Sequence, residues 1–142
     1  MNPENKPPRV VIDTNVLFSA LALPKDSPPA RVLDLAKAGK VEAFVSPFIL
    51  GELEKNLARK ADWDEERISA LRKKLRGFLI VIEPQARVDV IKRVVSDNRI
   101  LECALSAAAH VLITGNMKDL RPLGDFRGIK IMTPREFLDF VL

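Results

Sequence analysis

Short apolar runs rich in β-branched residues recur along this chain, and segments with helical periodicity separate them. The runs expected to form strands are residues 9–12, 41–45, 78–82, 110–114 and 128–132. Most are apolar on both faces, which is typical of strands buried in a parallel sheet. The alternation predicts an α/β fold, a three-layer α/β/α sandwich around a central, mainly parallel sheet of about five strands.

Capping residues and apolar spacing predict the helices between these strands. Helices are expected from near Asn15, over 28–37, from Pro47, over 63–76, from Asp97 and from Pro134 to Leu142, while residues 83–96 allow either a strand or a helix. Ser46, Asp97 and Thr133 are the expected N-caps. Gly39 and Gly77 are the expected stop signals of two helices.

Length and composition limit the class of protein. The chain has 142 residues, of which 47% are hydrophobic and 30% charged, as in an ordinary globular domain. We expect one domain over residues 9–142 and a disordered tail over residues 1–8. The single Cys103 and the single His110 exclude an internal disulfide and a structural zinc site of the usual kind. No signal peptide or apolar stretch of membrane-spanning length is visible, so we expect a cytoplasmic protein.

The excess positive charge is concentrated in one segment. The net charge is +4, and residues 55–76 hold eight basic and four acidic side chains, while the rest of the chain balances at fifteen of each. A polyanionic partner is therefore expected to meet the protein near Lys55, Arg59, Lys60, Arg67, Arg72, Lys73, Lys74 and Arg76. On charge alone, a solvated helical face is the preferred interpretation.

Acidic residues follow the expected strands on the side where ligands bind in open parallel sheets, beyond the carboxyl ends of the strands. They are Asp13, Glu52, Asp97 and Asp119. Each has a structural explanation by itself, as a turn, a surface helix residue, an N-cap or a loop residue. Together they would repel one another unless a cation compensated their charge. A site with oxygen ligands alone favours Mg²⁺ or Mn²⁺.

Four segments together resemble a PIN domain: IDTNVL, SPFILGEL, DNRILECAL and TGN with an aspartate three residues later. The resemblance extends from Arg9 to the C-terminus and is closest to the small prokaryotic PIN-family toxins of the VapC type. It implies a Mg²⁺- or Mn²⁺-dependent endoribonuclease, a cognate antitoxin and a homodimer. By the same resemblance, the metal-binding catalytic residues are Asp13, Glu52, Asp97 and Asp119, and the supporting residues are Thr14, Asn15, Ser46, Thr114 and Asn116.

One position departs from the pattern of many relatives. They carry an aspartate directly after the threonine and glycine of the fourth expected strand, where this chain has Asn116. Other relatives have the asparagine and an acid three residues later, as with Asp119 here. The fourth ligand is thus open between these two residues, and so is a choice of one or two metals.

With an RNA-cleaving site located, the basic segment is expected to hold the substrate. The residues expected to contact the RNA are Lys55, Arg59, Lys60, Arg72, Lys73, Lys74 and Arg76.

Other classes of protein fit less well or remain open. A haloacid-dehalogenase-type phosphatase expects a second aspartate where this chain has Asn15, and a phosphoreceiver domain expects an acidic pair and a late lysine that are missing. A housekeeping RNA-processing nuclease, and a non-catalytic module that binds RNA or protein, remain as alternatives. Metal-dependent cleavage that is lost in an Asp13→Asn variant separates an enzyme from a module.

Overall fold

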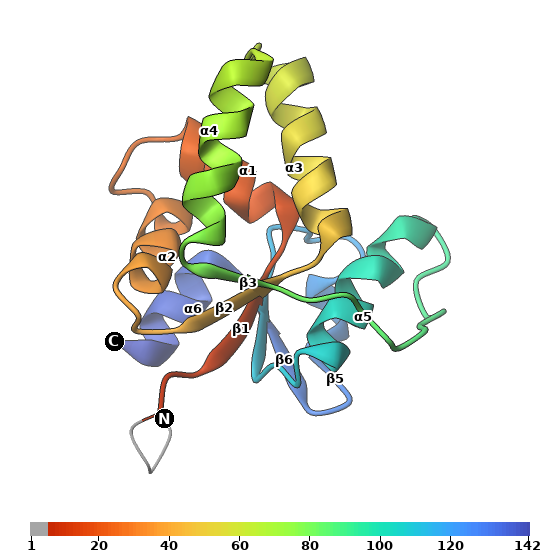
Figure 1. Ribbon diagram of the computed structural model, residues 1–142. Helices are drawn as coiled ribbons and strands as arrows, with labels where there is room; N and C mark the ends of the chain where they lie inside the picture. Colours follow the sequence, from red (N-terminus) through yellow and green to blue (C-terminus); the bar gives the residue numbers. More distant parts are fainter. Residues whose placement is uncertain (1–5) are drawn as a thin grey trace.

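The computed structural model describes residues 6–142, and a six-stranded sheet forms its centre (Figure 1). The strands are β1 (Arg9–Ile12), β2 (Glu42–Val45), β3 (Leu79–Val81), β4 (Val111–Ile113), β5 (Asp125–Phe126) and β6 (Ile129–Met132). Their order is β3-β2-β1-β4-β6-β5, and every pair is parallel except β5 with β6. The five expected strands are confirmed as β1 to β4 and β6. The two-residue edge strand β5 was not predicted, because two residues are too few to show the alternation of apolar and polar residues that is typical of a strand.

Helices cover both faces of the sheet, which confirms the three-layer α/β/α architecture. They are α1 (Thr14–Ala22), α2 (Pro28–Lys37), α3 (Pro47–Lys60), α4 (Glu65–Arg76), α5 (Asn98–Ser106) and α6 (Pro134–Val141), with short 3₁₀ turns at Val95–Asp97 and Arg121–Leu123. Helix α5 packs against β1, β2 and β4, whereas α1 and α6 both pack against α2. Helices α3 and α4 form a hairpin that rises beyond the sheet (Figure 1).

Capping bonds confirm two of the three expected helix caps. The hydroxyl oxygens of Ser46 and Thr133 accept the backbone N–H of Ile49 at 3.2 Å and of Glu136 at 3.2 Å. Asp97 occupies the predicted N-cap position of α5, but its side chain makes no capping bond and its backbone is helical. The preceding 3₁₀ turn leads directly into α5, so no extended capping residue is needed. The Asp97 carboxylate is therefore available for other contacts.

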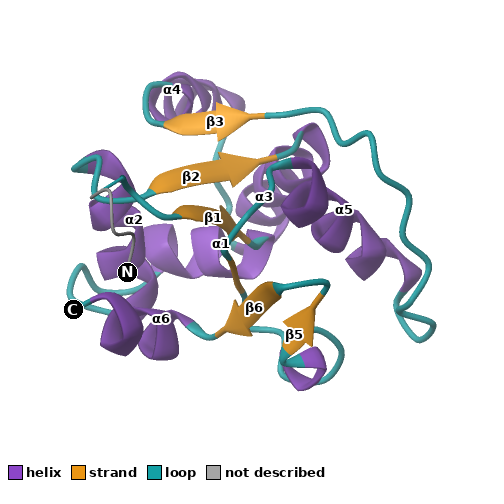
Figure 2. Cartoon of the chain, turned by 90° about the horizontal axis from the view of Figure 1, so that it is seen from below, coloured by secondary structure: helices purple, strands orange, loops and turns teal. Residues whose placement is uncertain are grey.

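Residues 83–94 form neither the strand nor the helix that the sequence left open. They run as an extended loop along the outside of the molecule from β3 toward α5 (Figure 2). The loop is held by side chains of α5: the Oδ1 of buried Asn98 accepts the N–H of Val90 at 3.0 Å and of Ile91 at 2.9 Å. The carboxylate of Glu102 accepts the N–H of Val88 at 3.0 Å. Because side chains satisfy this backbone, no regular periodicity is required of the segment.

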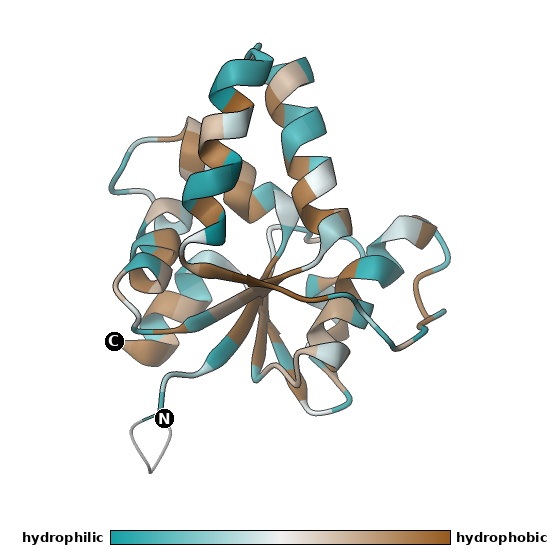
Figure 3. Ribbon diagram, viewed as in Figure 1, coloured by the Kyte–Doolittle hydropathy of each residue, from teal (hydrophilic) through white to brown (hydrophobic). Residues whose placement is uncertain are grey.

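The core lies around β1 and β4, where residues such as Val11, Leu112 and Ile113 are fully buried. Hydrophobic colour follows the strands and the inward faces of the helices, while the far end of the α3–α4 hairpin is hydrophilic (Figure 3). Within residues 6–142, no helix combines the length and the apolar character needed to cross a lipid bilayer.

The expected disordered tail over residues 1–8 falls mostly on residues 1–5, which lie outside the described residues. Within the described part, the carbonyl of Pro8 accepts the N–H of Glu42 at 2.9 Å, so contacts with the sheet begin before β1.

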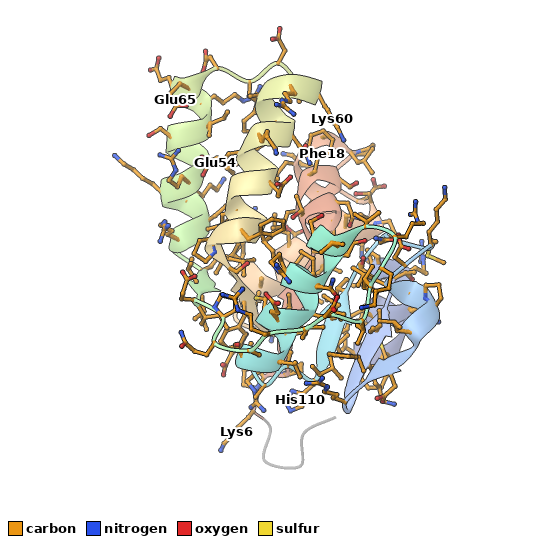
Figure 4. The ribbon with its side chains drawn as sticks, turned by 90° about the vertical axis from the view of Figure 1, so that its right-hand side faces the viewer. Lys6, Phe18, Glu54, Lys60, Glu65 and His110 are labelled. Atoms are coloured by element: carbon orange, nitrogen blue, oxygen red, sulfur yellow. The ribbon has the colours of Figure 1, made fainter. Side chains whose placement is uncertain are left out.

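His110 precedes β4, and its Nδ1 accepts the N–H of Arg9 at 2.9 Å. It lies far from Lys60 and Glu65 on the α3–α4 hairpin (Figure 4). Cys103 is buried in α5, and burial raises the pKa of its thiol to about 12.

Candidate metal centre

Asp13 lies where two neighbouring central strands end together. Ile12 of β1 pairs with Ile113 of β4, so Asp13 and Thr114 follow side by side at the carboxyl edge of the sheet. The Thr114 hydroxyl donates to Oδ2 of Asp13 at 2.7 Å, and the Thr14 N–H donates to Oδ1 at 2.7 Å. Both oxygens of this buried carboxylate are thus held in place by hydrogen bonds, and the parallel register decides their position.

The surroundings of Asp13 favour the neutral form of its carboxyl group. Burial and, to a smaller extent, the negative charge of Asp97 raise its pKa to about 6, against the opposing effect of the hydrogen bonds from Thr114 and Thr14. None of the basic side chains in residues 6–142 acts to lower it. A buried carboxylate beside a second acid and without a basic partner is the arrangement that a bound cation compensates.

An open cleft of about 180 Å³ lies in front of Asp13 and brings together three of the four expected acids. It is lined by Asp13, Thr14, Asn15, Phe48, Glu52, Asn56, Ser96, Asp97, Ile100 and Asn116. Asp97 stands on the α5 side of the cleft, and its pKa is raised, mainly by burial. Glu52 reaches the cleft from α3, where its Oε1 lies 3.3 Å from the Nζ of Lys55.

Asn116 contacts Asp97 through its amide nitrogen. Its Nδ2 donates to Oδ2 of Asp97 at 3.1 Å, whereas its Oδ1 accepts the N–H of Lys118 at 3.1 Å and of Asp119 at 3.0 Å. The amide oxygen therefore shapes the loop after β4. In this orientation Asn116 positions Asp97 and offers the cleft a donor.

Asp119 is the one expected acid that does not line the cleft. Nε of Arg93 donates to Oδ1 of Asp119 at 3.0 Å, and a terminal nitrogen of the same guanidinium donates to Oδ2. The Asp119 side chain is only 9% exposed, so the pair shields this carboxylate from solvent. Arg93 comes from the extended loop over residues 83–94. Because this loop has no regular periodicity, the sequence did not predict a role for Arg93.

The supporting residues divide between the cleft and the elements behind it. Oδ1 of Asn15 accepts the N–H of Gly115 at 3.1 Å, which joins the start of α1 to the loop after β4. Ser46 is fully buried at the start of α3, outside the lining of the cleft, and orients the helix that carries Glu52. The sequence analysis did not identify Arg93 and Asn98 as residues that support the site. The signal available for Asn98 was a polar residue next to Asp97, at the start of a helix expected to face the core.

The sequence matches the model of the PIN domain family over residues 9–118. The chain belongs to the PIN domain family. The uncharacterized protein MJ1680 of Methanocaldococcus jannaschii is 34% identical to this PIN domain, over 92% of this chain and 90% of that protein.

Two crystal structures share the PIN fold with this chain. VapBC2 from Rickettsia felis, bound to a DNA fragment from its promoter, superposes with a TM-score of 0.59 and 18% identity, over 87% of this chain and 96% of the other. FitAcB from Neisseria gonorrhoeae superposes with a TM-score of 0.52 and 17% identity, over 89% and 98% of the two chains. At such identities the likeness concerns the fold.

The donor set of this PIN domain fits a hard divalent cation. Among the described residues, no group of three or more acids, histidines or cysteines stands close enough to hold a metal ion by itself. Mg²⁺, however, keeps several water ligands in proteins and uses one or two carboxylates together with substrate phosphates. Asp13 and Asp97 provide two such carboxylates in one cleft, and Glu52 of α3 also lines it.

Part of the expected basic surface is committed to contacts within the α3–α4 hairpin. The guanidinium of Arg72 donates to both oxygens of Glu54, at 3.0 and 2.7 Å, and lies 3.7 Å from Glu65 (Figure 4 labels both acids). Arg67 stacks on the ring of Trp63 at 3.7 Å. Besides Arg67, the basic side chains of the segment that have no ion pair with a described residue are Arg59, Lys60, Lys73, Lys74 and Arg76.

Proposed function

We propose that this PIN domain is a Mg²⁺- or Mn²⁺-dependent endoribonuclease. The observation that supports it most directly is the pairing of Asp13 and Asp97 in one cleft, where both carboxyl groups have raised pKa values and Asp13 has no basic partner among residues 6–142. A divalent cation bound there would neutralise charge on a phosphodiester and lower the pKa of a water molecule.

The residues of the chain take separate roles in this proposal. Asp13 and Asp97 hold the cation, Thr114 and the N–H of Thr14 fix Asp13, and Asn116 fixes Asp97. Glu52 lines the same cleft from α3, where it would complete the ligand set or orient the attacking water. The free basic side chains of α3 and α4 contact the phosphates of the RNA strand without reading its sequence.

The first experiment measures cleavage of a mixed RNA pool by the purified protein in Mg²⁺, in Mn²⁺ and in EDTA. The proposal expects metal-dependent cutting that Asp13→Asn and Asp97→Asn each abolish. Asp139→Asn, the same chemical change on an exposed position of α6, serves as the control and keeps full activity. Cutting that persists in EDTA, or in both site variants, contradicts the assignment.

The biological role that we infer is that of the toxin in a type II toxin–antitoxin pair. The resemblance to VapC-type toxins and the shared fold with VapBC2 and FitAcB support it, and they suggest an antitoxin partner and a homodimer. Expression in a bacterial host should then arrest growth, Asp13→Asn should not, and coexpression of an antitoxin should relieve the arrest. Cleavage in vitro without growth arrest indicates an RNA-processing nuclease instead.

One observation favours a second candidate, a non-catalytic PIN-fold module that binds RNA or protein. Asp119 is engaged by Arg93, and no third acid joins Asp13 and Asp97 at metal-binding distance among the described residues. Isothermal titration with Mn²⁺ separates the two functions. An enzyme binds the ion in a manner that depends on Asp13, whereas a module shows no such binding.

A further inference from the structure

A second groove, of about 350 Å³, adjoins the acidic cleft on the other side of Asn15, which lines both. Its lining is Asn15, Val16, Ser19, Pro28, Pro29, Gly115, Thr133, Pro134 and Arg135. These residues come from α1, from the starts of α2 and α6, and from the loop after β4. The α1 residues follow β1, Gly115 follows β4, and α6 follows β6, so the groove lies along the same carboxyl edge of the sheet as Asp13.

The walls of this groove are suited to a flat apolar group. Helix α2 begins with Pro28 and Pro29, and α6 begins with Pro134, so none of these positions has a backbone N–H to offer. In α2 the next N–H, that of Ala30, bonds to Ser27. In α6 the N–H of Arg135 follows Pro134, and that of Glu136 bonds to Thr133. Helix starts that bind phosphate do so with free N–H groups. These two instead present mainly proline rings.

Three polar groups at the groove are free to bind a ligand. The Ser19 hydroxyl, the Nδ2 of Asn15 and the guanidinium of Arg135 form no hydrogen bond or ion pair with any residue in the described part of the chain. Their arrangement combines one cation with two groups that can hydrogen-bond to the edge of a base. Apolar walls together with a few polar groups are typical of small-molecule and nucleotide sites, whose volumes are about 300–1,000 Å³.

We propose that this groove binds one nucleotide of the RNA strand, next to the phosphodiester that is cut in the acidic cleft. The base lies against the proline rings, Ser19 and Asn15 contact its edge, and Arg135 contacts a phosphate. Proteins recognise single-stranded RNA by contacts to the faces and edges of unstacked bases, with aromatic rings or Arg guanidinium groups on the faces. Here proline rings would take the place of the aromatic rings. The inference rests on the proposed function, and it adds a base preference on one side of the cut, which the acidic cleft alone does not supply.

The direct test is an NMR titration of the protein in EDTA, where cleavage does not interfere. The probes are AMP, GMP, CMP, UMP, inorganic phosphate and short ribo-oligonucleotides. The proposal expects one nucleotide to shift the backbone amides of Ser19, Gly115 and Arg135, and an oligonucleotide that contains it to bind more tightly. Phosphate alone should leave the amides of Ser19 and Gly115 unmoved. Shifts confined to Ser96 and Asn116 in the acidic cleft, or to α3 and α4, overturn it, and so does the absence of any shift.

Variants of the groove sharpen this test. Ser19→Trp fills the groove and should weaken nucleotide binding about tenfold or more, in line with the loss of base stacking. Arg135→Ala should weaken oligonucleotide binding more than nucleoside binding. The matched controls are Ala38→Trp, at the exposed position that follows α2, and Lys130→Ala on β6, which should leave both affinities unchanged. Equal effects of the groove and control variants overturn the proposal.

Cleavage assays distinguish failure of this inference from failure of the proposed function. With oligonucleotides varied at one position on either side of the cut, the wild type should prefer one base, and Ser19→Trp should lose the preference while its Mn²⁺ affinity is unchanged. Metal-dependent cutting without such a preference overturns the groove and leaves the nuclease intact. Nucleotide binding in the groove without any RNA cleavage supports the groove and contradicts the nuclease.

Discussion

Asp13 is the residue whose surroundings most strongly oppose its own charge. Burial raises its pKa to about 6 in the folded protein, compared with 3.8 for an unperturbed aspartate. The folded state therefore binds the proton more tightly than the unfolded state does. Without metal, stability is lost as the pH rises from about 4 to 6, and the whole loss is present above pH 6. This is expected of a cation-binding site, because a bound cation restores the electrostatic stabilisation that the carboxylate loses when it is removed from water.

Removal of the charge of Asp13 should stabilise the metal-free protein. At pH 7 in EDTA, Asp13→Asn should raise the free energy of unfolding by up to about 3 kcal/mol, the equivalent of the shift at about 1.4 kcal/mol per pKa unit. The gain should shrink toward zero near pH 4, where the wild-type carboxyl group is neutral when folded. Urea unfolding at several pH values measures it. If the difference in unfolding free energy between Asp13→Asn and the wild type does not change with pH, the raised pKa of Asp13 is not its cause.

Arg93 should compete with a metal ion for Asp119. Arg93→Ala removes the guanidinium that holds this carboxylate, and Mn²⁺ affinity should rise by about fivefold or more. Even an exposed ion pair is worth up to about 1 kcal/mol, and the Asp119 carboxylate is largely shielded from solvent. Lys92→Ala is the matched control, because Lys92 lies on the same loop and pairs with exposed Asp89. Isothermal titration measures both. An unchanged affinity for Mn²⁺ in Arg93→Ala places Asp119 outside the metal centre.

At the scale of elements, α5 links the extended loop to the cleft. Its first residue, Asn98, is fully buried and bonds through both amide atoms to the loop and to the 3₁₀ turn before it: Nδ2 donates to the carbonyls of Ile91 at 2.9 Å and Val95 at 2.8 Å. Asp97 and Arg93 both lie within or beside this segment. The positions of Asp97 and Arg93 therefore depend on the side chain of Asn98.

Asn98→Ala should destabilise the fold and release the loop. Four backbone groups lose their partner, and we expect a loss of about 2–4 kcal/mol, given that unsatisfied buried polar groups cost about 1–3 kcal/mol each and some become hydrated. Hydrogen exchange at the amides of Val90 and Ile91 should accelerate more than at β1. Gln85→Ala, in the exposed part of the same loop, should change neither quantity. Full protection of Val90 in Asn98→Ala argues against this role.

At the scale of the whole molecule, the unpaired basic side chains of the α3–α4 hairpin adjoin an acidic cleft that is built mainly by other elements. The acids gather at the carboxyl edge of the sheet, while the unpaired basic side chains project from the α3–α4 hairpin, whose outer part is hydrophilic (Figure 3). Glu52 belongs to the same hairpin and contacts the cleft. An RNA strand held by the hairpin would thus be led toward the acids, because one element contributes to both surfaces.

Charge reversal on α4 should weaken RNA binding in a manner that depends on salt. Lys73→Glu/Lys74→Glu should lower the affinity and reduce the slope of log affinity against log salt by about 0.7 for each RNA phosphate that the variant no longer binds. The control, Lys40→Glu/Lys130→Glu, makes the same change in net charge away from the hairpin. Filter binding to the inactive Asp13→Asn protein at several salt concentrations measures both. Identical slopes in the two double variants contradict an RNA-binding surface on α4.

The sequence by itself determined the architecture and the edge at which the acids lie. Apolar runs, caps and proline positions act over a few residues, so β1 to β4, β6 and most helix starts could be predicted. The parallel arrangement then placed Asp13, Glu52 and Asp97 at one edge. The missing capping bond at Asp97 was not predicted, because a 3₁₀ turn before α5 leaves no local pattern of its own.

Only the tertiary structure decided which partner each of these side chains has. The pairing of Asp119 with Arg93, the contact of the Asn116 amide with Asp97, and the groove between the starts of α2 and α6 all join residues from separate elements. Such contacts depend on how packed helices and a long loop approach one another in space. Periodicity and capping carry no information on those distances, because they are properties of neighbours along the chain.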